Sequence, residues 1–233
     1  DNNATKTFTY QFEKNGIYDI PLVDYLKLPK WVKEDVLRLY RTYGFRDNVN
    51  SNIPLKIDPY YFGIWLGDGD SDSPSITNMD QEIIDYLFDF CKTNNHEIYF
   101  GDNSNCGKAK RIIIHDSYRR KNNLRTILNK EYNVLNNKHI PNIYLFTSEE
   151  NRLKLLAGLI DTDGFYSNGY YEVFTTSEKL AQDISKLCHS LGFVCNYKKK
   201  PKVSGYRISI TGNNLYKIPV LIPRKKCPVR KQI

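Results

Sequence analysis

Two apolar runs of similar character stand about 95 residues apart in this chain. The first, PYYFGIWLG (59–67), follows Asp58, and an Asp-Pro pair is typical of a helix N-terminus. The second, NRLKLLAGLID (151–161), follows TSEE (147–150), which has the form of a capping box. Each predicted helix ends just beyond its run at an Asp-Gly pair, Asp68-Gly69 or Asp163-Gly164, where we expect the glycine to leave the helix with positive φ. The pattern predicts two buried helices that end in the same way.

Similar elements follow each of these helices. Amphipathic patterns predict helices over 80–92 and 177–189, with capping signals at Asn78 and Thr175. Apolar and β-branched runs predict strands at 74–77, 96–100, 110–116, 170–176, 193–200 and 206–212. Each copy then closes with a short helix and an Ile-Pro pair, near 138–141 and 221–227. The repeated order of helix, strands, helix, strands and helix indicates an α+β protein with internal pseudo-twofold symmetry.

The first 55 residues differ from this repeat. Residues 7–26 carry the aromatic and β-branched residues of strands, and residues 28–41 have the pattern of a short amphipathic helix. A polar segment that ends in proline, 46–54, suits a linker. The sequence therefore predicts three parts, which are a lead-in over 1–55, a first subdomain over 56–143 and a second over 144–233.

Composition narrows the functional classes. Of the 233 residues 40% are hydrophobic and 13% aromatic, which is enough for packed cores and argues against disorder. The formal net charge of +8 points to a polyanionic partner, with nucleic acid the leading candidate and a merely solvated basic surface the alternative. No apolar run approaches the roughly 18 residues of a membrane helix, so no membrane partner is expected.

Five cysteines are present without any C-x-x-C pair, so neither a disulfide framework nor a zinc cluster fits. We expect thiols in a reducing, intracellular compartment, which would be the nucleus in a eukaryote.

Small residues lie on one face of each repeated helix. Gly63 and Gly67 are four residues apart, as are Gly158 and Thr162, and residues at this spacing share a helix face. Small residues allow two helices to approach closely, as they do in membranes. We therefore expect the two helices to pack against each other through these faces.

Such packing would bring the carboxylates of Asp68 and Asp163 together at the helix ends. Two adjacent carboxylates call for a hard divalent cation such as Mg²⁺, with Mn²⁺ as a substitute and with water and phosphate oxygens as further ligands. The alternative is that both residues only cap their helices, but a carboxylate at a helix C-terminus faces the unfavourable end of the dipole.

The motif LLAGLIDTDG (155–164) is similar to the LAGLIDADG, or dodecapeptide (DOD-type), motif of homing endonucleases and differs from its name at Thr162. YFGIWLGDGDSD (61–72) resembles the first motif of two-motif members carried inside inteins, of the yeast vacuolar ATPase type. The resemblance covers residues 56–233. It implies two αββαββα units with central paired helices and a β-saddle that binds double-stranded DNA.

The resemblance also implies roles for individual residues. It assigns catalysis to Asp68, Asp163, Lys138 and Lys226, and metal binding to Asp68 and Asp163 together with Gly67 and Thr162. Lys138 stands in a K-x-I-P segment, and Lys226 is the better match of two lysines in the second closing segment. Asp161 has no counterpart in the first motif, where Leu66 stands, so we interpret it as structural or as a residue that supports the metal ligands.

The DNA-binding residues are expected among the basic side chains of the strands and closing segments. The candidates are Lys108, Lys110, Arg111, Arg119, Arg120, Lys198, Lys199, Lys200, Lys202, Arg207 and Lys225. Most basic residues in such interfaces contact phosphates and carry no sequence information, so no base is assigned to any of them.

The expected function is that of a monomeric, site-specific endonuclease. It would make a metal-dependent double-strand break with short 3′ overhangs in a long, asymmetric DNA target. The chain has neither an initial Cys or Ser nucleophile nor a final His-Asn pair, so we expect an intein-derived endonuclease that does not splice itself. An RNA maturase and a DNA-binding relic that no longer cleaves are the alternatives. The two aspartates and the lysines of both closing segments favour the nuclease.

Overall fold

The computed structural model describes residues 11–37, 54–101, 108–116, 123–201 and 204–229. Contacts divide the chain into two compact units, residues 1–42 and 43–233. The boundary expected near residue 144 falls inside the second unit, and the proposed division into two subdomains there stays a prediction. Within the described ranges, no helix combines the length and apolar character needed to cross a membrane.

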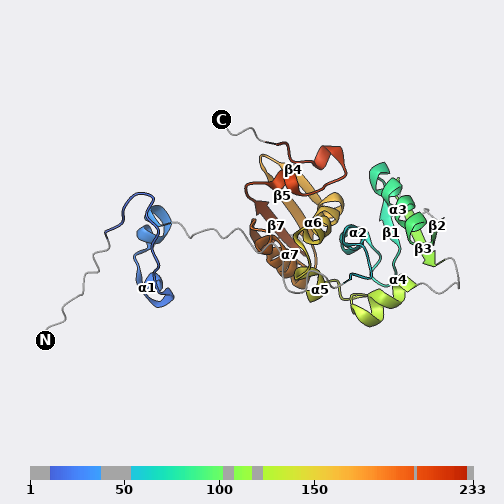
Figure 1. Cartoon of the computed structure of the whole chain (residues 1–233), viewed down its shortest axis with the longest axis horizontal. Helices are drawn as coiled ribbons and strands as arrows, with labels where there is room; N and C mark the ends of the chain where they lie inside the picture. The colour runs from blue at the N-terminus through green and yellow to red at the C-terminus, as the bar shows by residue number, and fades with distance from the viewer. Residues whose placement is uncertain (1–10, 38–53, 102–107, 117–122, 202–203, 230–233) are drawn as a thin grey trace. The chain divides into compact units, whose positions relative to one another are not determined.

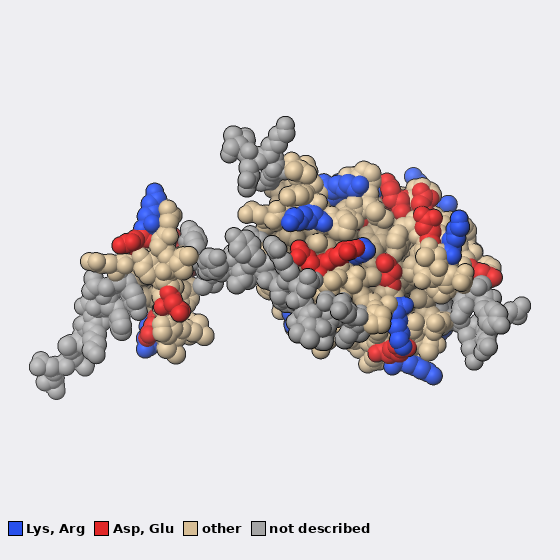
Figure 2. Space-filling model, in the orientation of Figure 1, with Lys and Arg blue, Asp and Glu red and all other residues tan. Residues whose placement is uncertain are grey.

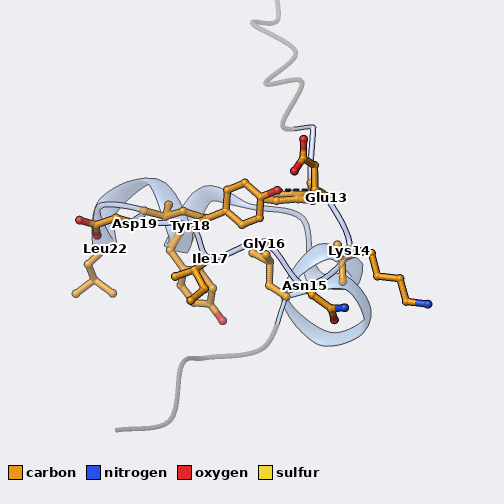
Figure 3. A pocket seen from close by; sticks show the side chains of 13 residues that line it. Glu13, Lys14, Asn15, Gly16, Ile17, Tyr18, Asp19 and Leu22 are labelled. Carbon is orange, nitrogen blue, oxygen red and sulfur yellow. Dashed lines mark hydrogen bonds between the residues drawn. The ribbon is translucent and has the colours of Figure 1, made fainter.

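The described part of the first unit, residues 11–37, contains two short helices and few buried side chains. Helix α1 spans Leu22–Lys27 and the π-helical turn η1 spans Val32–Val36. The strand expected over 7–26 is wrong for its described part, because Asn15 turns the chain with positive φ and α1 begins at Leu22, after its N-cap Pro21. Tyr18 folds back so that its hydroxyl accepts a hydrogen bond from the Glu13 amide, beside a cavity of about 800 Å³ (Figure 3).

The second unit contains the repeat, and the structure confirms the α+β class (Figure 1). Its first half comprises α2 (Pro59–Asp68), β1 (Ile76–Asn78), α3 (Gln81–Thr93), β2 (His96–Phe100), β3 (Lys110–Asp116), α4 (Asn123–Thr126), η2 (Ile127–Glu131) and α5 (Asn142–Leu145). Its second half comprises α6 (Glu149–Asp163), β4 (Gly164–Ser167), β5 (Tyr170–Thr175), α7 (Glu178–Ser190), β6 (Val194–Lys199), β7 (Tyr206–Thr211), η3 (Leu215–Lys217) and η4 (Pro223–Lys225).

Each half has an antiparallel sheet, with strand order β1-β3-β2 in the first and β4-β5-β7-β6 in the second. Strand β4 was not expected from the sequence. It forms a hairpin with β5 around Asn168 and Gly169, which both have positive φ, as two-residue hairpin turns require. The first half has only an isolated bridge, between Gly69 and Ile76, at the corresponding place.

Helices α2 and α6 pack against each other through their small residues, as expected. A Cβ atom added at Gly158 would lie 2.4 Å from the Tyr60 carbonyl oxygen and 2.9 Å from the Cα of Gly63. Around this contact the side chains of α2 are completely buried, including those of Phe62 and Trp65. The helix pair is therefore the centre of the second unit, and its position fixes where both Asp-Gly ends lie.

The helix ends differ in detail from the sequence expectation. The N-caps of α3 and α7 are Asp80 and Ser177, two residues beyond Asn78 and Thr175. The side chains of Asn78 and Thr175 accept hydrogen bonds from the amides of these cap residues, at 2.7 and 3.2 Å. Because side-chain bonds of this kind occur both at caps and in the turns before them, the sequence pattern placed each helix start too early.

The glycines after Asp68 and Asp163 also act differently from the expectation. Gly69 and Gly164 have extended backbones, with φ of −74° and −106°, so positive φ is not the reason for glycine. Space is the reason, since an added Cβ would lie 2.3 Å from the Trp65 carbonyl oxygen at Gly69 and 2.8 Å from the Ile160 Cα at Gly164. Glycine lets each chain turn tightly over the last turn of its helix.

Candidate active site

The carboxylates of Asp68 and Asp163 lie at the adjoining ends of α2 and α6. The Asp163 carboxylate faces the last turn of α2, because a Cβ added at Gly67 would be 3.4 Å from Asp163 Oδ2 and 2.0 Å from Thr162 Oγ1. Asp68 Oδ2 accepts a hydrogen bond of 2.6 Å from the side-chain amide of Asn78. The small residues of both helices therefore bring together the two carboxylates that the sequence singled out.

The electrostatics of this pair favour a bound cation. Removal of water by the surrounding protein and the charge of Asp68 together raise the pKa of Asp163 to about 6, against the opposing charges of Lys138 and Lys225. The pKa of Asp68 is also raised by burial, although its bond to Asn78 and the charges of Lys225 and Lys138 oppose the rise. Asp163 remains exposed at the surface, so a ligand can reach it. A cation that neutralised both carboxylates would relieve their repulsion.

Lys138 lies at the end of α2. Its ammonium group donates hydrogen bonds to the carbonyls of Gly67 and Gly69, at 3.2 and 2.7 Å, and lies 5.3 Å from the centre of the Trp65 ring. Burial lowers the pKa of Lys138, while the charges of Asp163 and Asp68 raise it. The lysine therefore caps the helix that carries one carboxylate and places a positive charge next to both.

Lys225 has the same place at the end of α6, whereas the sequence comparison with the family motif had favoured Lys226 for that place. The Lys225 ammonium group donates to the carbonyls of Ile160, Asp161 and Thr162, at 3.1, 2.8 and 2.9 Å. Lys225 is buried whereas Lys226 is exposed. The lysine beside the carboxylates is therefore Lys225, and its burial disagrees with the DNA-binding role predicted for it.

Asp161 is structural, as the sequence suggested. It is fully buried and accepts hydrogen bonds from the Tyr60 hydroxyl at 2.6 Å and from the amides of Leu221 and Ile222 at 2.8 and 3.2 Å. These bonds join α6 to α2 and to the segment that leads into Lys225. Asp161 thus positions the second lysine of the site without facing the paired carboxylates.

The two carboxylates suit a hard cation whose remaining ligands are water molecules or phosphate oxygens of the substrate. Across the described ranges, His, Cys, Asp and Glu side chains form no group of three or more able to hold a metal ion. The predicted ligands Gly67 and Thr162 have carbonyls that accept hydrogen bonds from Lys138 and Lys225. Mg²⁺ binds through one or two carboxylates and retains water or substrate phosphate oxygens, so Asp68 and Asp163 fit it.

Most of the predicted DNA-binding residues lie in the part of the chain that the structure describes. Lys110 and Arg111 lie on β3, Lys198 and Lys199 on β6, and Arg207 on β7, while Lys108 and Lys200 stand next to strands. Lys200 lies 5.2 Å from the centre of the Phe174 ring. Arg119, Arg120 and Lys202 fall outside the described residues. The face of the second unit seen in Figure 2 mixes basic with acidic side chains, so no uniformly positive patch covers that face.

Sequence comparisons match part of this chain to a family model and to a curated relative. Residues 150–218 match the family model described as a LAGLIDADG-like domain, which spans α6 and the second sheet. A replicative DNA helicase DnaB from Mycobacterium intracellulare is 38% identical over 145 residues, which are 62% of this chain. The chain spans about a fifth of the length of this curated relative, since the match covers 20% of it.

Solved structures with similar backbones include the homing endonuclease I-DmoI in complex with DNA and Mn. That match has a TM-score of 0.48 and 15% identity, and covers 70% of this chain and 91% of I-DmoI. The N-terminal LAGLIDADG domain of DUF199/WhiA matches with a TM-score of 0.43 and 11% identity, over 74% and 90% of the two chains. At these levels of similarity, function has to be argued from the site of this chain.

Proposed function

We propose that this chain is a site-specific DNA endonuclease that depends on a divalent metal ion. The pairing of Asp68 and Asp163 at the ends of α2 and α6 carries the proposal, because two carboxylates with raised pKa are unfavourable without a cation. The LAGLIDADG-like match over 150–218 and the net charge of +8 support it.

The residues of the site have distinct tasks in this proposal. Asp68 and Asp163 hold Mg²⁺, or Mn²⁺ in its place, and such an ion would supply Lewis acidity toward the phosphodiester and lower the pKa of a bound water. Lys138 and Lys225 fix the helix ends by bonding their carbonyls. Their positive charges also favour the close approach of DNA phosphates to a site that otherwise presents two carboxylates.

The form of the substrate follows from the two halves of the second unit. Both carboxylates come from a single chain, so a monomer suffices for cleavage. The described strands form a three-stranded sheet in the first half and a four-stranded sheet in the second, so each half would contact a different part of a long, asymmetric target. We further propose a double-strand break with short 3′ overhangs, as the resemblance to homing endonucleases implies.

The origin that we propose is an element carried inside a host protein, as inteins are. The 38% identity extends over only a fifth of the helicase DnaB from Mycobacterium intracellulare. A match confined to one part of a longer protein is what an inserted endonuclease would give. In that case the target is the host-gene sequence without the insertion.

Cleavage of supercoiled plasmid tests the proposal directly. The plasmid would carry the uninterrupted host-gene junction, or a random library where the host is unknown, with Mg²⁺ compared with EDTA. Asp68→Asn and Asp163→Asn should each abolish double-strand cleavage. Asp72→Asn is the matched control, because Asp72 is an exposed carboxylate of the same loop and its loss should leave cleavage unchanged.

DNA binding without cleavage in any divalent metal would contradict the proposed enzymatic activity and would identify a DNA-binding relic. Preference for structured RNA over duplex DNA would instead identify an RNA maturase. Full cleavage by both asparagine variants would show that the carboxylate pair is not the catalytic site.

A further inference from the structure

The two sheets carry an arginine at the same place in the repeat. Arg111 on β3 pairs with Thr77 on β1, and Arg207 on β7 pairs with Phe174 on β5. Thr77 and Phe174 are equivalent, because each immediately precedes the residue, Asn78 or Thr175, that bonds the cap of the next helix. Arg111 and Arg207 are therefore counterparts under the pseudo-twofold symmetry.

Both arginines lie on the sheet face that is turned away from the core. On β3 the neighbours Ile112 and Ile114 are buried, and on β7 Ile208 and Ile210 are buried. Side chains alternate along a strand, so the arginines point to the opposite face. Their side chains are 41% and 49% exposed, which leaves them within reach of a ligand bound against that face.

A carboxylate holds each arginine in place. Asp70 Oδ2 accepts from Arg111 Nε and Nη2 at 3.1 and 2.7 Å. Asp70 is itself fixed, since its amide donates to the Ser75 carbonyl and its carboxylate accepts from Ser73 Oγ. In the second half, Arg207 Nε lies 2.9 Å from Glu172 Oε1, and Glu172 is only 12% exposed. Different acids thus orient two equivalent guanidinium groups.

We infer that Arg111 and Arg207 each read a guanine, one in each half of the target and at equal distances from its centre. The inference rests on the proposed endonuclease function. Arginine binds O6 and N7 of guanine with two parallel hydrogen bonds, which is the commonest specific contact in the major groove. A carboxylate that already holds the guanidinium reduces the ordering that binding would require. An arginine that only neutralises phosphate needs no such orientation.

The neighbours of the two arginines predict how the half-sites differ. Arg207 lies between Phe174 and Lys198 in the second sheet, whereas Arg111 lies next to Thr77 in the first. The guanines should therefore be shared by both half-sites while the adjacent base preferences differ.

Selection of bound sequences from a randomised duplex library tests this inference. The full chain would be used without divalent metal, so that binding is read independently of cleavage. Arg111→Ala should reduce the guanine preference about 5- to 150-fold at one position, and Arg207→Ala at the symmetry-related position in the other half. Arg111→Lys and Arg207→Lys should retain affinity but lose the same preferences, because lysine lacks the planar fork.

A lysine control and variants of the two carboxylates that hold the arginines distinguish guanine recognition from a general effect of charge. Lys198→Ala removes an exposed cation next to Arg207, and should lower affinity for all sequences equally. Asp70→Asn and Glu172→Gln should weaken the two guanine preferences while the arginine charge stays.

Each failure has a different meaning. If the arginine variants lose affinity for all sequences equally, the arginines contact phosphates. If the base preferences of the variants are unchanged, the arginines form solvated ion pairs only. Either result overturns the inference about guanine but does not contradict the proposed endonuclease function. A wild-type protein that selects no sequence would overturn both proposals.

Discussion

Gly158→Ala tests the contact on which the site depends. An alanine Cβ there would lie 2.4 Å from the Tyr60 carbonyl oxygen and 2.7 Å from the Ile64 amide nitrogen. Both are backbone atoms of α2, which no rotamer change can move. Ordinary contact begins near 3.4 Å, so the helices would have to separate by about 1 Å.

The expected net effect is a destabilisation of about 2 kcal/mol. Overpacking of a core costs about 1–3 kcal/mol, and a clash with rigid backbone belongs at the upper end of that range. Alanine offsets about 1 kcal/mol of this because it favours the helix over glycine. For a protein of this size the difference corresponds to a melting temperature lower by about 4–8 °C.

Thermal unfolding of the metal-free protein measures this effect. Gly101→Ala is the matched control, since its Cβ would contact side-chain atoms and no backbone, 3.2 Å from Ile113 Cδ1 and 3.5 and 3.6 Å from Arg111 Cδ and Cβ. The control should stay within about 0.5 kcal/mol of wild type. If Gly158→Ala melts at or above the wild-type temperature, helix propensity outweighs the clash and the close approach of α2 and α6 is refuted.

Two further changes test the electrostatics of the site. Asp163→Asn should stabilise the metal-free protein by about 1 kcal/mol at pH 8. The pKa of Asp163 is about 6 in the folded protein and 3.8 ordinarily, so folding disfavours its charged form. Solvent screening of this exposed carboxylate reduces the effect. The gain should shrink as pH falls through 6 and vanish below about 4, where the carboxyl is protonated in both states; urea titrations across this range measure it, and a gain that grows toward low pH would contradict the assignment. Lys225→Met should cost about 1–3 kcal/mol in the same assay, because it leaves carbonyls at the end of α6 without their donor, while Lys226→Met should change stability by less than about 0.5 kcal/mol. Equal effects of the two lysine variants would show that Lys225 is not the cap.

Much of the fold could be predicted because the repeat appears twice. Apart from β4, the described strands of the second unit lie within about two residues of their expected positions, and α3 and α7 begin and end near the expected residues. Asp58 caps α2 through side-chain bonds, as the sequence indicated, and Ser148 caps α6, one residue after the first position of the TSEE box. These are local signals, and tertiary packing reinforces them.

The errors occur where contacts between distant residues decide the structure. The resemblance favoured Lys226 over Lys225 in the second closing segment, and sequence alone could not show which of the two contacts the end of α6. In the first half Lys138 precedes Ile140 in the sequence, whereas in the second half Lys225 follows Pro223, and both bond carbonyls at a helix end. Strand β4 could have been found, because the Asn-Gly pair at 168–169 is a strong hairpin signal.

The comparison of the two halves indicates which features the site requires. The core of α2 is aromatic where that of α6 is aliphatic, and the lysines reach their helix ends from opposite sides of an Ile-Pro pair. What the halves share is a small residue at the closest approach, a carboxylate in the last turn and a glycine that folds tightly over it. Those positions are set by the distance between two backbones and by the place of a charge, which no other residue type can satisfy. The remaining positions only have to fill the core, and many apolar residues can do so.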